Sequence, residues 1–191
     1  MTSSTQSLTT QLPDVLDELR EAQQFFSVWR AFTNAENQAV FEPTMRRYPQ
    51  FFDSVVRAHL AALIVALYRL YEGGSKTRSL RRLYEDTKSL NIFEQKIIES
   101  ASELDYSIRD IWKKVCILRT NVFGHKSAKL CSEKAFEKAE LTPDELATMI
   151  KRAQRLFNCI SRTLTHSAHA FNTSATRDVS NLMTRLGRNA L

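Results

Sequence analysis

Arg119 and His125 are the residues whose types and spacing offer chemistry, and they lie six positions apart in the chain. Arginine is permanently charged and presents a planar fork of donors, whereas histidine titrates near pH 6.5. In an ideal helix this spacing leaves the two side chains about 120° apart. If Gly124 ends the helix, His125 is free to turn toward Arg119. A fixed cation and a titratable group would then lie together, half shielded, at the mouth of a helical bundle.

A structural role accounts for the same pair without any chemistry. A histidine at a helix end can bind the last carbonyl groups. An arginine can form an ion pair with a neighbouring helix. The two residues alone leave both interpretations open.

The other candidate residues give weaker evidence for a functional site. His59 lies within an apolar stretch and is expected to be a hydrogen-bonded core histidine. His166 and His169 have a spacing that suits a metal, but no carboxylate or thiolate stands at a matching interval. Cys159 is interpreted as a small apolar residue of a helix. The sequence therefore predicts neither a metal site nor a cofactor, and it lacks the patterns of nucleotide-binding loops and nucleophile elbows.

The helix that would position Arg119 has the clearest hydrophobic pattern in the chain. Asn91 and Glu94 resemble a capping box at its start, and Gly124 offers a natural stop. Apolar residues between them recur in alternating steps of four and three, which is typical of a helix packed nearly parallel to its neighbours. This seam consists of Ile97, Ala101, Leu104, Ile108, Ile111, Val115, Leu118 and Val122.

Several other segments predict helices. The first helix is expected to begin near Pro13, because proline suits the first helical position. Pro43 and Pro49 are expected to break the chain, and Pro49 to open a helix that runs to residue 72. The remaining predictions are a short basic helix over residues 79–89, a helix starting at Thr142-Pro143-Asp144-Glu145, and a final amphipathic one with Val179, Leu182, Met183, Leu186 and Gly187 as its cap.

Composition favours a single all-α domain. A chain of 191 residues with 43% hydrophobic side chains is long enough for one core. Only four glycines and four prolines occur, too few for many short strands and their turns. We therefore expect an all-α bundle of four or more helices over residues 1–191, with a core of about 13–172 and a basic amphipathic segment over 173–191.

The net charge of +6 is unevenly distributed along the chain. The last 41 residues hold seven basic side chains and one acidic one, so the first 150 residues are neutral overall. Such a basic segment could bind phosphate backbones. It could equally be a solvated face that keeps the protein soluble.

Neither a leader nor a membrane span is predicted. Residues 1–12 are polar and lack a basic start and an apolar run. The most apolar stretch, residues 60–68, is much shorter than the roughly 20 residues needed to cross a bilayer. The three cysteines form no close pair, which fits reduced thiols. We therefore expect a cytoplasmic protein with no membrane partner.

The segment 118–125, Leu-Arg-Thr-Asn-Val-Phe-Gly-His, resembles the Arg-x(4–6)-His signature of the HEPN superfamily. These are all-α proteins that include many metal-independent ribonucleases. The surroundings resemble the abortive-infection, AbiU-like branch, in which a Ser-Leu-rich helix, here residues 79–83, precedes the long helix. The resemblance covers roughly residues 60–161. The family often has an asparagine directly after the arginine, whereas here Thr120 stands there and Asn121 follows.

This resemblance implies a metal-independent endoribonuclease that acts as a toxin or abortive-infection effector and leaves a 2′,3′-cyclic phosphate. Such cleavage needs a base for the ribose 2′-hydroxyl, an acid for the leaving oxygen and a cation for the phosphorane. The implied roles are His125 as acid or base and Arg119 as phosphate clamp. Asn121 would orient the histidine or bind a phosphate oxygen. The implied RNA-binding residues are Thr120, Lys126 and Lys129.

The resemblance also implies partners. HEPN nucleases usually dimerise so that two motifs face one cleft, which implies a twofold homodimer here. RNA would be the substrate, and an antitoxin or another regulatory protein could silence the enzyme. The displaced asparagine indicates an alternative, a catalytically inactive HEPN-type bundle that serves as an interaction module in a defence system.

Overall fold

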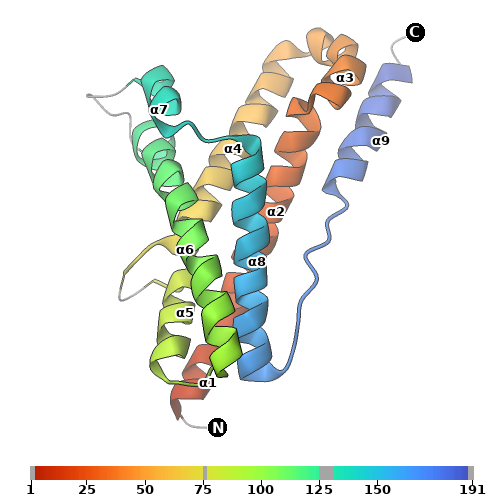
Figure 1. The fold of residues 1–191 in the computed structure, drawn as a ribbon. Helices are drawn as coiled ribbons and strands as arrows, with labels where there is room; N and C mark the ends of the chain where they lie inside the picture. Colours follow the sequence, from red (N-terminus) through yellow and green to blue (C-terminus); the bar gives the residue numbers. More distant parts are fainter. Residues whose placement is uncertain (1–2, 75–76, 125–130, 189–191) are drawn as a thin grey trace.

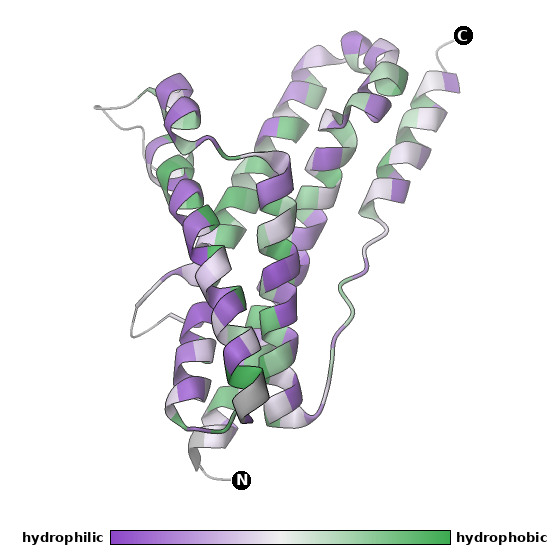
Figure 2. Cartoon of the chain, in the orientation of Figure 1, coloured by the Kyte–Doolittle hydropathy of each residue, from purple (hydrophilic) through white to green (hydrophobic). Residues whose placement is uncertain are grey.

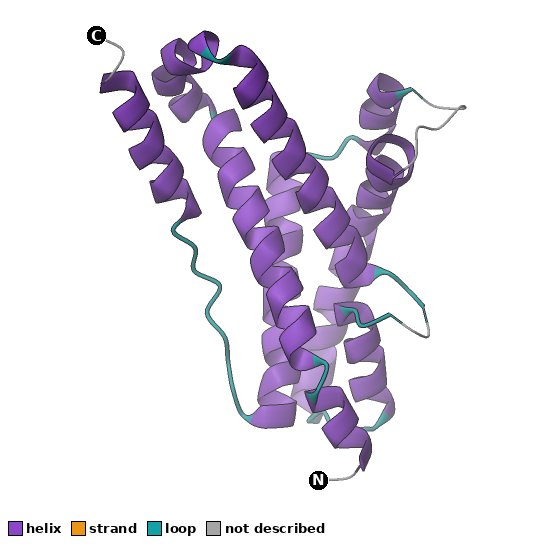
Figure 3. Ribbon diagram, turned by 180° about the vertical axis from the view of Figure 1, so that it is seen from behind, coloured by secondary structure: helices purple, strands orange, loops and turns teal. Residues whose placement is uncertain are grey.

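The computed structural model describes residues 3–74, 77–124 and 131–188, and every regular element in these ranges is a helix (Figure 3). The predicted all-α helical bundle is therefore confirmed. In chain order the elements are α1 (Ser3–Thr9), α2 (Leu12–Thr33), α3 (Ala35–Arg47), α4 (Pro49–Tyr71), α5 (Leu80–Ser89), α6 (Gln95–Leu118), the π-helical turn η1 (Arg119–Gly124), α7 (Ser132–Ala139), α8 (Pro143–Thr165) and α9 (Ala175–Arg188).

Four long helices, α2, α4, α6 and α8, form the body of the bundle (Figure 1). Helix α2 packs along α4, α6 packs along α8, and α2 also contacts α8. The short helices α1 and α5 lie together against one end of α8. At the opposite end of α6, the helix α7 packs against α6 and η1. The chain around Arg119 therefore contacts α4, α6 and α7.

Two apolar clusters stabilise this arrangement. The larger one lies among α2, α4, α5, α6 and α8 and contains the fully buried Leu19, Leu67, Ile108 and Phe157. In Figure 2, hydrophobic and hydrophilic residues alternate along α6 and α8, as expected for helices with one buried face. The smaller cluster joins α9 to α2, α3 and α4, and its members are Ala31, Phe32, Phe41, Phe52, Val179 and Met183. An irregular connection over residues 166–174 leads from α8 to α9 (Figure 3).

The start of α8 follows the sequence prediction closely. Thr142 accepts from the backbone N–H of Glu145 at 3.2 Å, and the Glu145 carboxylate accepts from the backbone N–H of Thr142 at 2.9 Å. Pro143 occupies the first helical position. The predicted capping box is thus confirmed, and the apolar residues that follow it are buried: Leu146, Met149, Ala153, Phe157, Ile160 and Leu164.

Three predicted helix ends are wrong. Pro43 does not break the chain but lies inside α3. Proline has no N–H group, so the Ala39 carbonyl group, four residues earlier, loses its helical partner. Both residues are exposed, and this carbonyl group can bind water instead. Asn91 has a left-handed φ of 52°, and α6 begins instead after Glu94 without a side-chain cap. Gly187 does not end α9, which continues to Arg188.

Three helices were not predicted: α3, which contains Pro43, and the short helices α1 and α7. Helix α1 has seven residues and α7 has eight, so both are too short to show a repeating pattern of apolar residues. Leu8 of α1 and Ala135 of α7 are nevertheless buried. Their helical form depends on packing against the long helices, because isolated helices of this length are marginal in water.

Helix α4 is more apolar than the sequence argument recognised. Over an 18-residue window its mean hydropathy is 1.6, so by length and composition alone it could cross a membrane. In the structure Leu63, Leu67 and Leu70 of α4 are buried in the bundle. In that window 28% of the residues are buried, so α4 packs against the bundle along one face.

The Thr142→Ala variant should lower the free energy of unfolding by about 1 kcal/mol, because it removes one side of the capping box. Urea denaturation followed by circular dichroism measures this change. Thr148→Ala, within the same helix, is the matched control and should be close to neutral. Equal losses in the two variants would show that the cap contributes nothing.

Candidate functional site

The buried seam of α6 leads directly to Arg119. The seam prediction is confirmed from residue 101 to residue 118, since all six of its members there are buried: Ala101, Leu104, Ile108, Ile111, Val115 and Leu118. Ile97 and Val122 at its two ends are partly buried and pack against the same cluster. Leu118 is the last residue of α6, and Arg119 follows at the point where the helix leaves the core.

Residues Arg119–Gly124 continue the helix as a π-helical turn. A π turn closes its hydrogen bonds five residues back, and such turns occur frequently at functional sites. Asn121 supports the turn, because its Nδ2 donates to the carbonyl oxygen of Ile117 at 2.8 Å. Thr120 is exposed on the outer side. The turn changes the direction in which the side chains after Leu118 project.

Three of the predicted site residues lie outside the described residues: His125, Lys126 and Lys129. The described helix reaches Gly124, the predicted stop. The structure therefore places Arg119, Thr120 and Asn121 together on one turn, and the histidine and lysine assignments stay predictions.

The Arg119 side chain is oriented by an aromatic ring. Its guanidinium carbon lies 4.6 Å from the centroid of the Tyr68 ring, on α4. In the part of the chain that the structure describes, Arg119 forms no ion pair with a carboxylate. The structural alternative considered above, an arginine neutralised by a neighbouring helix, is thus not what these residues show. The half-buried guanidinium keeps its charge for another anion.

Tyr68 is itself held by Trp112 of α6. The two rings are stacked with centroids 6.0 Å apart and an interplanar angle of 20°. The indole Nε1 of Trp112 also donates to the Tyr68 carbonyl oxygen at 3.3 Å. Burial raises the pKa of Tyr68 above its ordinary value of 10.0, and the Glu72 carboxylate adds to this, while Arg119 opposes it. The phenol therefore remains neutral near pH 7.

Gly124 packs against the Arg119 side chain from within the same turn. A Cβ atom added at Gly124 would lie 2.7 Å from the Arg119 carbonyl oxygen and 3.3 Å from its Nη1. The first distance is shorter than real Cβ contacts show, and it involves backbone that cannot swing away. Glycine is needed here for this close approach, and only a residue without a side chain lets the turn form over the guanidinium.

Cys116 lies next to this site but is not a nucleophile. Burial raises the pKa of its thiol from 9.0 to about 11, although Arg119 opposes the shift. At neutral pH the group is a thiol, and only the thiolate attacks or binds metals readily. Cys159 behaves similarly, because burial raises its pKa as well. The sequence interpretation of Cys159 as a packing residue agrees with its half-buried position in α8.

The remaining histidines have structural surroundings. His59 Nδ1 lies 2.7 Å from the Val55 carbonyl oxygen, and its ring meets the edge of Phe25, as expected for a packed histidine. His169 Nε2 lies 3.2 Å from the Ser161 hydroxyl. His166 is exposed and ends α8 in a left-handed conformation. Among the described residues, no group of three or more His, Cys, Asp or Glu side chains is placed to hold a metal.

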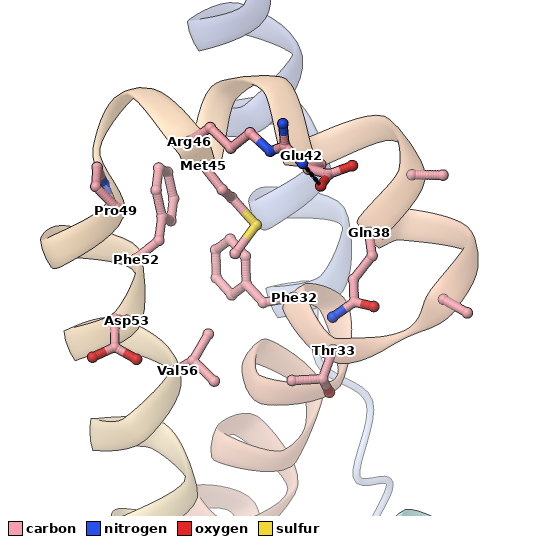
Figure 4. A pocket seen from close by; sticks show the side chains of 12 residues that line it. Phe32, Thr33, Gln38, Glu42, Met45, Arg46, Pro49, Phe52, Asp53 and Val56 are labelled. Atoms are coloured by element: carbon pink, nitrogen blue, oxygen red, sulfur yellow. Dashed lines mark hydrogen bonds and ion pairs between the residues drawn. The ribbon is translucent and has the colours of Figure 1, made fainter.

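A cavity between α3 and α4 lies away from Arg119. It has a volume of about 700 Å³ and opens between α3 and α4 over the end of α2 (Figure 4). Phe32, Met45, Phe52 and Val56 form its apolar part, and Arg46 and Glu42 form an ion pair at its rim. None of the predicted site residues lines it.

Tyr68 and Trp112 are the site residues that sequence reasoning missed. Tyr68 stands in an apolar stretch and Trp112 stands between Ile111 and two lysines, and amphipathic helix packing explains both residues without a role in a site. They come from helices that are far apart in the sequence, and only the packing of α4 against α6 and η1 brings them to Arg119.

Comparison with protein families gave a match to the AbiU2 family of HEPN domains over residues 6–182, from α1 into α9. The match extends well beyond the region 60–161 on which the resemblance in the sequence rested. Comparisons with curated proteins and with solved structures gave no significant match.

The Gly124→Ala variant should lose at least about 1 kcal/mol of stability, because the added methyl group overpacks the π turn against Arg119. Gly187→Ala is the matched control, since its Cβ would meet only Thr44 Oγ1 at an ordinary 3.6 Å. The control should change stability by less than about 0.5 kcal/mol, because Gly187 lies in the last turn of α9, next to its end at Arg188. Thermal unfolding compares the two, and an equally small change in both would contradict the close approach at Gly124.

Alkylation by iodoacetamide at pH 8 should modify the exposed Cys131 first. Cys116 should react at least about tenfold more slowly, because a pKa of about 11 leaves little thiolate at that pH. Its rate should rise about tenfold per pH unit up to pH 10, since the thiolate fraction grows while the pH stays below the pKa. Peptide mass spectrometry measures each rate, and rapid labelling of Cys116 at pH 8 would contradict its burial.

Proposed function

The chain belongs to the AbiU2 family of HEPN domains, an abortive-infection type, and on this premise we propose that it is a metal-independent endoribonuclease that acts as a toxin or antiviral defence effector. It would cut RNA by transesterification and leave a 2′,3′-cyclic phosphate and a 5′-hydroxyl. The observation that carries the proposal is Arg119, a half-buried cation that an aromatic ring orients and that no described carboxylate neutralises.

Arg119 would bind the scissile phosphate. In the reaction the ribose 2′ oxygen attacks phosphorus, its proton passes to a base, and the bond from phosphorus to the 5′ oxygen breaks. Negative charge builds up on the phosphorane oxygens, and a guanidinium with free N–H donors stabilises it in a partly shielded site. The neighbouring Cys116 thiol stays protonated, so it does not neutralise the guanidinium as a thiolate would.

His125 would transfer the proton. It follows directly after the turn that positions Arg119, and a histidine is the side chain whose ordinary pKa suits acid–base work near pH 7. Asn121 would assist through its side-chain oxygen, while its Nδ2 supports the turn. Thr120, Lys126 and Lys129 would extend the phosphate track along the RNA.

Cleavage needs both a base and an acid, and a single histidine beside a single arginine supplies only one of the two. We propose that the protein works as a twofold homodimer, in which two motifs face one cleft and supply both acid and base. A cytoplasmic location fits RNA as substrate and thiols without disulfide partners. A protein partner, an antitoxin or another regulator, would keep the enzyme silent.

The decisive experiment is an RNA-cleavage assay of the purified protein in EDTA, with analysis of the product ends. The wild type should produce cyclic phosphate ends. Arg119→Gln and His125→Ala should each reduce the rate by about a hundredfold or more, as expected for loss of charge stabilisation or of acid–base catalysis. Arg57→Gln and His166→Ala are matched controls at exposed positions and should keep full activity.

A second function has one observation in its favour. Asn121 is bonded to its own helix through Nδ2 and stands one place later than the family pattern. If the wild type and both variants are equally inert on total RNA, the protein is better explained as a HEPN-type interaction module. Overexpression then separates the two, because a nuclease harms its host and His125→Ala relieves the harm, whereas a module is harmless in both forms.

A further inference from the structure

We propose that Tyr68, held in place by Trp112, is the positioning residue of Arg119. The ring of Tyr68 would orient the guanidinium for a phosphate without neutralising its charge. This inference rests on the proposed function, in which Arg119 binds the RNA phosphate. It assigns a role to two residues outside the Arg-x(4–6)-His segment.

The other arginines of the chain show how differently Arg119 is held. Several are oriented by a carboxylate one helical turn away, among them Arg57 by Asp53 at 3.0 Å and Arg109 by Asp105 at 2.6 Å. Such a partner fixes the guanidinium but occupies its donors and cancels its charge. An aromatic face attracts the same cation through its ring electrons and leaves the N–H groups at the guanidinium edge unoccupied.

The platform is rigid because two helices define it. Tyr68 comes from α4 and Trp112 from α6, and stacking together with the hydrogen bond from Nε1 to the Tyr68 carbonyl oxygen ties them at two points. Arg119 lies on the same helical rod as Trp112, two turns further along. The distance between ring and guanidinium is therefore set by the packing of α4 against α6 and not by the Arg119 side chain alone.

The guanidinium is also confined by Gly124. Gly124 approaches so closely that an added Cβ would lie 3.4 Å from Cζ of Arg119. The side chain is thus restricted by the Tyr68 ring and by the backbone of its own turn. An arginine restricted in this way loses less rotamer freedom when it binds a phosphate than a free one does.

The test compares Tyr68→Phe with Tyr68→Leu. Phenylalanine keeps the aromatic face and should retain RNA cleavage within about twofold. Leucine removes the face, and kcat/KM should fall about tenfold, the loss expected for a partly buried cation–π contact that orients a catalytic group. Tyr106→Leu is the matched control, because Tyr106 is 73% exposed on α6. Thermal unfolding of each variant identifies any that fail to fold.

A second measurement reads the position of Arg119 directly. The NMR resonance of the Arg119 Nε–Hε group can be assigned with the Arg119→Gln variant. It should change its chemical shift in Tyr68→Leu, because the ring current of Tyr68 is lost, and much less in Tyr68→Phe, which keeps the ring. Inorganic phosphate should perturb this resonance in the wild type, and Tyr68→Leu should raise the apparent Kd about tenfold. The Trp112→Leu variant should move the resonance in the same direction, since Tyr68 loses its support.

The outcomes separate this inference from the proposed function. If Tyr68→Leu changes neither the resonance nor phosphate binding nor cleavage, the positioning role is overturned. Equal losses in Tyr68→Phe and Tyr68→Leu would also overturn it, because they would place the role in the hydroxyl group. If the wild type does not cleave RNA but both the resonance and the phosphate affinity change as expected, the positioning role stands and the nuclease proposal falls.

Discussion

Burial of the α6 seam fixes one rotation of this helix about its axis, and the candidate site depends on that rotation. Six apolar side chains from residue 101 to residue 118 lie in the core against α4 and α8. Trp112 is then turned toward α4, where it meets Tyr68, and Lys114 is turned toward α8, where it binds Glu145 at 2.6 Å. A rotation by one residue would separate both pairs and expose the seam. The hydrophobic pattern of a single helix therefore determines where the cation at its end is held.

Arg119 differs from the arginines that form exposed ion pairs. On the outside, ion pairs such as Arg46 with Glu42 and Arg78 with Asp14 are exposed and contribute little to stability. At the end of α6 the guanidinium is half buried. An arginine neutralised by a carboxylate there would be unavailable to a phosphate, and one without any partner would lose hydration at a cost in free energy. The ring of Tyr68 resolves this conflict, because it compensates part of the lost hydration while the charge remains available.

The long helices could be predicted because their patterns are local. The seam of α6, the proline and capping box of α8 and the start at Pro49 each reside in adjacent residues. Pro43 could not be placed correctly, since its tolerance inside α3 depends on exposure, which is a tertiary property. The motif pointed to Arg119, but its partners Tyr68 and Trp112 could not be found, because no spacing rule connects residues 68, 112 and 119 across two helices. The π-helical form of the turn was likewise not predicted, as no residue type specifies it.

The π-helical turn gives the site a tolerance to changes in length. An α-helix and a π turn differ by one residue per hydrogen-bonded loop. Loss of one residue within Arg119–Gly124 could therefore be absorbed by conversion to an α-helical turn, without shifting the seam up to Leu118. An insertion or deletion before Leu118 could not be absorbed in this way. It would rotate the buried face of α6 away from the core. The spacing between Arg119 and the residues after Gly124 can therefore vary in evolution at little cost to folding. The length of α6 before Leu118 must stay the same.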